Sequence, residues 1–406
     1  MTDTRADEPR RAFWRTPALR TDEEDSVHRG VTWLELFLDV FFVVAVAGLA
    51  HQLAQHLSWA EVGTFVAQFL PLVWLWVGCT YYMERFETEG VENRLILFCF
   101  MLVVGGMAVF SHDGLGENYA GYVLCFAAGR AFTTLLWLRA GYHDKQFRPV
   151  ARIYGAGFSL AITCQVLSTF LDGGSRFVLF GVGLLVDAVT PLFAIAQTRA
   201  LPSVSTSKHP ERFGLFTILV LGETAVGVTA GLAGPHSVTF EQASGAALGV
   251  LLGFSMWSIY FDFIARRSLR QGPWHLYGWT YLHLALYMSA VCVGAAILNA
   301  TQFEGTVLPA KVRFLVTGAL GSFLVCVGLL ECLLERRRHE PTHLLLSPAM
   351  KLACGFALPF VALIEANKFI FFAYFYPLLV VHIVYGHIAW FRQEAPASDL
   401  DDVLDG

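Results

Sequence analysis

The stretch V-T-W-L-E-L-F-L-D-V-F-F-V-V-A-V-A-G-L-A-H, residues 31–51, decides the fold class. Beyond Asp39 it is apolar without interruption as far as His51. A helix of about 20 mainly apolar residues spans the roughly 30 Å hydrocarbon core of a bilayer. Comparable stretches recur along the whole chain of 406 residues. The sequence therefore predicts an all-α protein that crosses a membrane many times.

The composition supports a membrane protein and excludes several other classes. Hydrophobic residues make up 55% of the chain and charged residues only 15%, against about 25% charged residues in soluble domains. A net charge of −5 excludes a basic nucleic-acid-binding protein, because such proteins carry an excess of Lys and Arg. The 8 cysteines form no C-x-x-C motif and lie mostly within apolar stretches. We therefore expect buried thiols, no metal site and no cofactor.

Twelve stretches are long and apolar enough to be interpreted as membrane-spanning helices. The connections between them are short, and some carry turn sequences such as Asp172-Gly173-Gly174, so none can hold a soluble domain. The expected spans are residues 32–56, 60–83, 94–111, 119–141, 150–171, 176–197, 212–233, 241–264, 275–299, 311–333, 348–366 and 368–391.

These spans are expected to form two six-helix halves, residues 31–200 and 201–392. The halves resemble each other weakly at an offset of 179 residues, where Leu36-Phe37 aligns with Leu215-Phe216. Six spans return the chain to the same side of the membrane, so such a repeat is parallel, with its axis along the membrane normal. The sequence therefore predicts two parallel pseudo-repeats.

Lys and Arg residues are unevenly distributed, which predicts the orientation of the chain. With the N-terminus inside, 23 of them fall on the cytoplasmic side and 4 on the outer side. Positively charged loops stay in the cytoplasm. We therefore expect a multi-pass protein of the cell inner (plasma) membrane. Its N-terminal tail, residues 1–30 and partly disordered, and its acidic C-terminal tail, residues 393–406, are both expected in the cytoplasm.

Two acids near the start of the first span form a candidate ion-binding pair. Glu35 and Asp39 are four residues apart, so both carboxylates share one helix face. Two like charges in a medium of low dielectric favour the binding of a proton or a cation. The structural alternative is that Glu35 stabilises the first helical turn while Asp39 pairs with an Arg.

Glu223 is the strongest single candidate for ion or proton binding. It lies about eleven residues into its span, within Leu221-Gly222-Glu223-Thr224, and so near the middle of the bilayer. An ionisable group at that depth usually faces a partner or a water-filled cavity. Gly222 lacks a side chain and lets a neighbouring helix or an ion approach. The alternative is a neutral Glu that is hydrogen-bonded across helices.

Arg130 and Asp187 are candidates for a counter-charge or a pathway element. Arg130 lies midway along the fourth span and keeps its proton, so it needs a carboxylate or water at that depth. Asp187, Asp39 and Glu223 are the carboxylates that could pair with it, and an anion site is the alternative. Pro191, four residues after Asp187, is expected to kink the sixth span.

Further polar residues are expected to lie at helix ends on the cytoplasmic side. Asp262 is four residues from Arg266, and Arg85 is four residues from Glu89. We interpret such pairs mainly as solvated anchors, with Asp262 a possible pathway element and Arg85 an accessory residue. The Trp74-Leu75-Trp76 run is expected to serve packing and the membrane interface.

The first span and two later motifs resemble the bacterial low temperature requirement protein A (LtrA) family. The resemblance rests on Val31 to His51, on E-R-F-G-L-F-T-I-L-V-L-G-E from Glu211 to Glu223, and on W-x-x-Y-F-D from Trp257 to Asp262. The family pattern usually has F-F-D where this chain has Phe37-Leu38-Asp39, a packing change that leaves the acid in place. The resemblance implies a bacterial inner-membrane protein named for a requirement in cold growth, and it implies no biochemical activity.

A weaker resemblance links the first span to the lysosomal and bacterial potassium channels built from six-helix repeats. Phe37-Leu38-Asp39 is similar to the end of their R-x-x-x-F-S-D signature. Arg29 lies too early for that spacing, Leu38 replaces the Ser, and Phe216-Thr217-Ile218 in the second half carries no acid. The major facilitator signature is absent from Glu84 to Arg94, which argues against that twelve-helix family.

These observations favour a transporter or ion channel that binds a proton or cation at Glu35, Asp39 and Glu223. The expected partners are membrane lipids and a small ion or small-molecule substrate, with no nucleic acid, and a homodimer is left open. One alternative is an intramembrane enzyme that acts on lipid or a small molecule through His51, His283 or His382. The sequence contains no P-loop, G-x-S-x-G or H-E-x-x-H motif, so the enzyme hypothesis is less favoured than the transporter or channel hypothesis. A structural membrane protein without transport activity is the third hypothesis.

Overall fold

A computed structural model describes residues 16–17, 19, 31–86, 91–201, 208–233, 239–265, 267–336 and 342–391. Within these ranges the regular structure is helical, and the only β-type pairings are isolated bridges such as Leu269 with Leu334. The all-α fold predicted from the sequence is therefore confirmed. Most of both predicted tails, residues 1–30 and 393–406, lies outside the described residues.

Eleven helices of the described part are long and apolar enough to cross a membrane. The short helix α7 continues α6 after an interruption at Ala194, and the π-helix η2 continues α9. The elements are α1 (Trp33–Gln55), α2 (Trp59–Arg85), α3 (Val91–Phe110), α4 (Tyr119–His143), α5 (Arg148–Ser168), α6 (Gly174–Phe193), α7 (Ile195–Thr198), α8 (Lys208–Leu232), α9 (Phe240–Tyr260), η2 (Phe261–Ala265), α10 (Pro273–Gln302), α11 (Ala310–Leu333), α12 (Leu346–Val361) and α13 (Lys368–Phe391).

The twelfth apolar helix, α12, is shorter than the sequence predicts. It has 16 residues and ends at Val361, whereas the expected span ends at residue 366. Ala362 and Leu363 form a turn instead, because the chain must reverse there to reach α13, which begins at Lys368.

The chain divides into two compact units, which are described separately. Unit 1 contains residues 1–49, 63–209 and 271–273, and unit 2 contains residues 50–62, 210–270 and 274–406. The predicted six-plus-six duplication stays a prediction, because this division depends on contacts and not on internal likeness.

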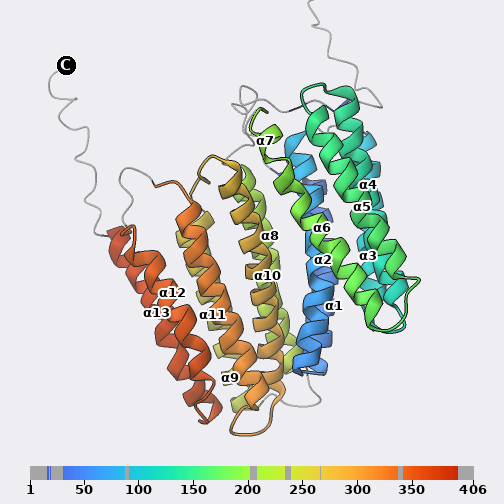
Figure 1. Cartoon of the computed structure of the whole chain (residues 1–406). Helices are drawn as coiled ribbons and strands as arrows, with labels where there is room; N and C mark the ends of the chain where they lie inside the picture. Colours follow the sequence, from blue (N-terminus) through green and yellow to red (C-terminus); the bar gives the residue numbers. More distant parts are fainter. Residues whose placement is uncertain are drawn as a thin grey trace, which may run out of the picture. The chain divides into compact units, whose positions relative to one another are not determined.

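In unit 1, consecutive helices pack as neighbours: α3 against α4, α4 against α5, and α5 against α6 (Figure 1). A cluster of aromatic side chains joins one end of α2 to α4 and α5. The Trp137 ring lies 5.3 Å from that of Tyr82, 5.5 Å from that of Phe147 and 5.3 Å from that of Tyr154. These contacts fix the end of α2 next to the buried charges described below.

In unit 2, α10 is the most buried helix, with 78% of its apolar window inside the protein. Helix α11 packs on α12, α12 on α13, and α13 on α9. Figure 1 shows α12 and α13, in red, running next to each other. Helix α10 therefore provides the core against which polar groups of unit 2 are buried.

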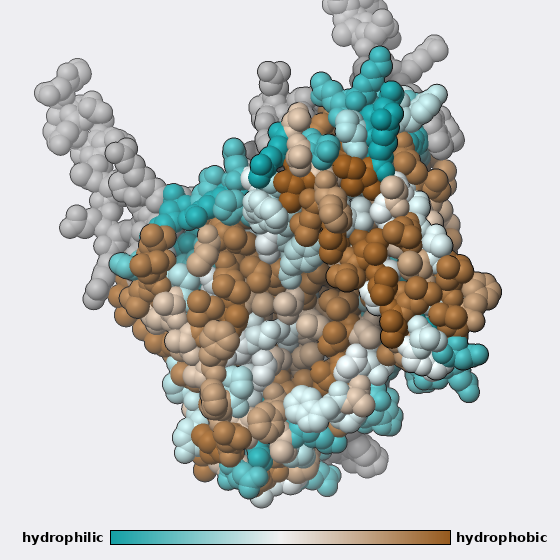
Figure 2. Space-filling view, in the orientation of Figure 1, coloured by the Kyte–Doolittle hydropathy of each residue, from teal (hydrophilic) through white to brown (hydrophobic). Residues whose placement is uncertain are grey.

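The outer surface carries apolar stripes that suit a lipid environment. On α3, Leu95, Phe98 and Leu102 are 54%, 55% and 61% exposed, and their spacing of three and four residues places them on one helix face. In Figure 2, hydrophobic side chains cover much of the middle of the visible helices, and hydrophilic ones gather toward the helix ends. Water would not favour such a surface, whereas a bilayer does.

Candidate functional site

A buried ion pair joins two helices of unit 1. Arg130 on α4 and Asp187 on α6 are 1% and 0% exposed. The Nε atom of Arg130 donates a hydrogen bond of 2.7 Å to Oδ2 of Asp187, and its Nη2 donates to Oδ1. This bidentate geometry is among the strongest that a guanidinium and a carboxylate form. Of the three carboxylates considered for Arg130 from the sequence, the structure pairs it with Asp187.

Further contacts hold this ion pair in place. The indole Nε1 of Trp74 donates to Oδ1 of Asp187 at 3.1 Å. The guanidinium of Arg130 also lies over the ring of Phe158, 4.5 Å from its centroid. Gly78 provides the space, because a Cβ atom there would lie 2.5 Å from Nη1 of Arg130. Both charges are thus bound by fixed partners in a desolvated setting.

Asp39 is a second fully buried carboxylate of unit 1. It is 0% exposed, and Nε1 of Trp76 donates to its Oδ1 at 2.8 Å. Residues 74 and 76 point about 200° apart around a helix. Helix α2 therefore supplies one indole to Asp187 and another to Asp39. The sequence interpretation assigned Trp74 and Trp76 to packing and missed this donor role, because an indole N–H in an apolar stretch gives no sign of its acceptor.

Glu35 lies at the start of α1, where the structure uses it as a cap. Its Oε2 accepts from the backbone N–H of Thr32 at 3.4 Å, and the Thr32 hydroxyl accepts from the N–H of Glu35 at 3.3 Å. This reciprocal pair is a capping box. The geometry is that of the structural alternative considered for Glu35, and its role in ion binding stays a prediction.

Glu223 lies on α8 in unit 2 and is 4% exposed. Helix α10 crosses closely at this point, since a Cβ atom on Gly294 would lie 2.7 Å from the backbone oxygen of Glu223. Thr224 does not reach the carboxyl group, because its hydroxyl donates to the Leu221 carbonyl at 2.7 Å. Within the part of the chain that the structure describes, no hydrogen bond or ion pair reaches the Glu223 carboxyl group.

His283 is buried on α10 between two hydrogen-bonding partners. Its Nδ1 lies 2.8 Å from the Trp279 carbonyl, and its Nε2 lies 2.9 Å from the Tyr260 hydroxyl. A carbonyl only accepts, so Nδ1 carries a hydrogen and donates it to the Trp279 carbonyl. His51, in contrast, is exposed and lies 2.9 Å from the amide of Gln55.

Asp262 and Arg85 lie at helix ends, as the sequence predicts. Asp262, in η2, accepts from the Ser258 hydroxyl at 2.9 Å. Arg85 is half-buried as the last residue of α2. Their expected partners, Arg266 and Glu89, lie outside the described residues.

The comparisons with known proteins identify the family. The profile of the bacterial low temperature requirement A protein (LtrA) matches residues 30–386. The chain belongs to the LtrA family. This confirms the resemblance seen in the first span and the two later motifs. An uncharacterized protein of Rhizobium meliloti (strain 1021), RA0937, is 28% identical to this LtrA chain over 256 residues, which cover 59% of this chain and 60% of the relative. No solved structure matches.

A buried polar cluster of this LtrA protein was not predicted. Lys351 on α12 is 0% exposed, and its Nζ donates to Oε2 of Glu331 at 2.9 Å. Nη1 of Arg267 donates to Oε1 of Glu331 at 3.3 Å, and the Ser347 hydroxyl donates to Oε2 of the same carboxylate at 2.8 Å. Lys351 follows the connection before α12 closely, and a charge at such a position is typical of a solvated loop end. Its position near a helix start gave no sign that it is buried.

The candidate residues of this LtrA protein are divided between the two units. Asp39, Arg130 and Asp187 belong to unit 1, whereas Glu223, Asp262 and the residue pair Tyr260–His283 belong to unit 2. Among the described residues, no three His, Cys, Asp or Glu side chains are grouped so that they could hold a metal ion.

Proposed function

We propose that this LtrA protein is a membrane transporter or channel that binds a proton or small cation at Glu223. The observation that carries this proposal is the Glu223 carboxyl group, which is 4% exposed and has no hydrogen-bond or ion-pair partner among the described residues. An ionised carboxylate in the middle of a membrane helix costs about 2.5–3.5 kcal/mol on insertion scales. A bound proton or cation removes most of that cost. Binding and release of the ion can therefore drive a conformational change of the protein.

The other buried carboxylates support this assignment by contrast. Asp187 is bound by Arg130 and Trp74, and Asp39 accepts from Trp76. A carboxylate that accepts hydrogen bonds from fixed donors changes its protonation state less readily than a carboxylate without such donors. We therefore assign the Arg130–Asp187 pair to a fixed counter-charge and Asp39 to a second, weaker ion site.

We further propose that the protein resides in the bacterial inner membrane with both termini in the cytoplasm. Its distribution of Lys and Arg supports this orientation, with 23 on one side and 4 on the other. A role in cold growth, suggested by the family name, belongs to the same proposal.

The proposal is tested with the purified full-length protein in liposomes that contain a pH-sensitive dye. An imposed potassium or sodium gradient is expected to drive proton movement in the wild type. Glu223→Gln is expected to slow it by more than about tenfold, because an amide has no proton to release at neutral pH. Asp39→Asn is expected to have a smaller effect.

The matched control is Glu304→Gln, which removes an exposed carboxylate in the connection after α10. This variant should keep the wild-type rate. If the wild type moves neither protons, sodium nor potassium, and Glu223→Gln only lowers thermal stability, the transport proposal is wrong and a structural role replaces it.

A further inference from the structure

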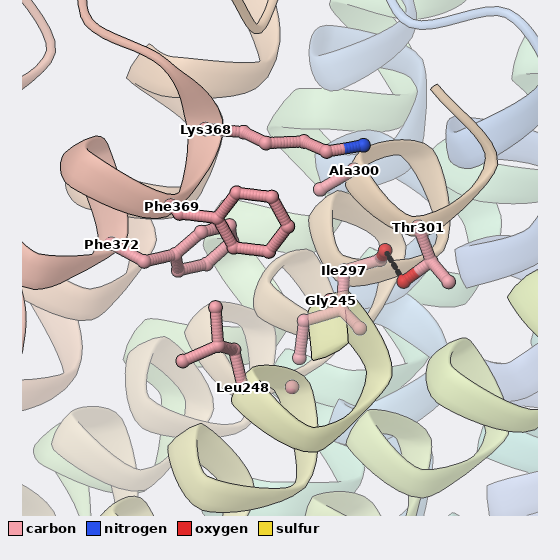
Figure 3. Close-up of a pocket in the computed structure, with 9 residues that line it drawn as sticks. Gly245, Leu248, Ile297, Ala300, Thr301, Lys368, Phe369 and Phe372 are labelled. Carbon is pink, nitrogen blue, oxygen red and sulfur yellow. Dashed lines mark hydrogen bonds between the residues drawn. The ribbon is translucent and has the colours of Figure 1, made fainter. Parts of the chain in front are cut away.

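A small pocket of unit 2 lies between α9, α10 and α13 (Figure 3). Leu248 of α9, Ile297 of α10 and Phe372 of α13 form its apolar wall, and Lys368 of α13 is its charged residue. The cavity volume is about 10 Å³, which is the space of about one water molecule. An enclosed metabolite does not fit, so an occupant must lie partly outside the pocket.

Three helix ends place this pocket at the boundary of the membrane. Lys368 is the first residue of α13, and Thr301 is the residue before the last of α10. Gly245 is also within the first two turns of α9, which begins at Phe240. Membrane helices end where hydrocarbon gives way to lipid headgroups. The pocket therefore lies at the depth of lipid phosphates and the first carbons of their acyl chains.

The pocket is bounded by one glycine, in a regular row of three, whose missing side chain leaves space that no neighbouring atom fills. Gly245, Gly249 and Gly253 follow each other at intervals of four residues on α9. A Cβ atom on Gly249 would lie 2.7 Å from Cγ2 of Val228, and one on Gly253 would collide with the hydroxyl of Thr224, so these two glycines allow α8 to pack. A Cβ atom on Gly245 would meet nothing within 4 Å. The missing side chain of Gly245 thus leaves space that helix packing does not use.

A positive charge lies at one end of this apolar space. Lys368 is 5% exposed, and its Nζ donates to the Phe303 carbonyl, beyond the end of α10, at 3.1 Å. Figure 3 shows its side chain extending toward α10, with Phe369 and Phe372 below it. On two of the helices that form the pocket, α9 and α13, Leu251 and Ile370 are 46% and 52% exposed. The pocket thus combines an ammonium group with an apolar wall, and the helices around it carry exposed apolar side chains that acyl chains can cover.

We propose that this pocket binds an anionic phospholipid of the surrounding bilayer. The headgroup phosphate lies next to the Lys368 ammonium group, and one acyl chain lies along Leu248 and Phe372. A cation beside an apolar wall at headgroup depth complements both parts of such a lipid. The bilayer supplies this molecule at high local concentration, which suits a shallow site. The inference does not depend on transport and goes beyond the proposed function.

The test uses the full-length protein, freed of native lipid in a nonionic detergent and titrated with phosphatidylglycerol or phosphatidylcholine. Native mass spectrometry counts the lipids that each chain retains. We expect preferential retention of one phosphatidylglycerol. Lys368→Gln should lower its apparent affinity about fivefold, in line with the attraction of one Lys for an anionic membrane surface. Lys368→Arg should keep most of the wild-type affinity for phosphatidylglycerol.

Gly245→Leu tests the apolar part of the site, since a Cβ atom at this position would meet nothing within 4 Å and a larger side chain is expected to occupy the open space. It should also reduce retention of phosphatidylglycerol. Lys311→Gln, at an exposed position at the start of α11, and Gly318→Leu, at an open position on α11, are the matched controls and should bind as the wild type does.

Equal retention of phosphatidylcholine, or undiminished binding by Lys368→Gln, would overturn the proposal. Displacement of the lipid by inorganic phosphate alone would also overturn it, because the site would then bind a free anion and not a phospholipid. All three results are read from binding, so they are independent of whether the Glu223 transport assay succeeds.

Discussion

Trp74 and Trp76 show how single residues make buried carboxylates tolerable in this protein. Each indole donates one hydrogen bond, the first to Asp187 and the second to Asp39. An indole adds a large apolar surface together with one donor, so it solvates an acid without bringing further charge into the membrane. Asp187 has a guanidinium in addition, whereas no such partner reaches Glu223 among the described residues. The acids therefore differ in how firmly their charge is held.

The Arg130–Asp187 pair gives a prediction at this scale. Arg130→Met leaves a buried carboxylate without its cation and should destabilise the protein by about 3–5 kcal/mol. The double variant Arg130→Met, Asp187→Leu removes both charges and should be clearly more stable than the single variant. The apparent melting temperature of the detergent-solubilised protein, followed by size-exclusion chromatography after heating, measures the difference.

This double-mutant comparison distinguishes a coupled pair from two independent contributions. If the loss in the double variant equals the sum of the losses in Arg130→Met and Asp187→Leu, the two residues are not coupled, and the pairing is wrong. Lys145→Met, at an exposed position between α4 and α5, removes a positive charge outside the core and should leave the melting temperature unchanged.

The sequence could indicate the depth of each charged residue but not its partner. Arg130 could be seen to need a carboxylate, yet choosing Asp187 required the packing of α4, α5 and α6, which apolar residues leave undetermined. Lys351 was missed for the related reason that a Lys next to a loop looks solvated unless its neighbours are known. Its burial depends on Glu331 and Arg267, which come from other parts of the chain, and on Ser347, which lies four residues before it on α12.

At the scale of elements, the crossing of α8 and α10 is set by glycines. A Cβ atom on Gly294 would lie 2.7 Å from the backbone oxygen of Glu223, and one on Gly227 would strike the backbone of Gly294. Backbone atoms cannot move aside as a side-chain end can. The two helices therefore approach closely where Glu223 lies, as small residues allow between membrane helices.

Gly294→Val is expected to separate these helices and destabilise unit 2. Overpacking costs typically about 1–3 kcal/mol, and the collision with backbone places this variant at the upper end of that range. Gly318→Val, on α11, is the matched control, because a Cβ atom there meets nothing within 4 Å. Thermal unfolding in detergent compares the two, and an equal melting temperature for both would contradict a close crossing at Gly294.

The helices themselves could be predicted well, because their length is dictated by the bilayer and their composition by its apolar interior. The first span was expected at residues 32–56 and is observed as Trp33–Gln55. The last span was expected at residues 368–391 and is observed as Lys368–Phe391. A change of helix type within the eighth span, residues 241–264, was not predicted. The π-helix at Phe261–Ala265 packs against α11, and such a local change of winding follows from tertiary contacts that periodicity does not contain.

For the whole molecule, the orientation depends on whether α12 crosses the membrane. Its 16 residues extend about 24 Å at 1.5 Å per residue, which is less than the roughly 30 Å hydrocarbon core. A short helix can still cross when the bilayer thins or the residues beyond its ends complete the path. With α12 crossing, the eleven longer helices and α12 return the chain to its starting side.

We therefore expect both termini in the cytoplasm, and this can be measured in a bacterial host. Green fluorescent protein fused to either terminus should fluoresce, and alkaline phosphatase fused at the same positions should be inactive. Phosphatase inserted after Asp172, in the connection between α5 and α6, should be active and serves as the outer-side control, because the distribution of Lys and Arg places that connection outside. If only the C-terminal fusion reports the outer side, α12 does not cross, and Lys368 at the start of α13 then lies in the other half of the membrane from the one that twelve crossings imply.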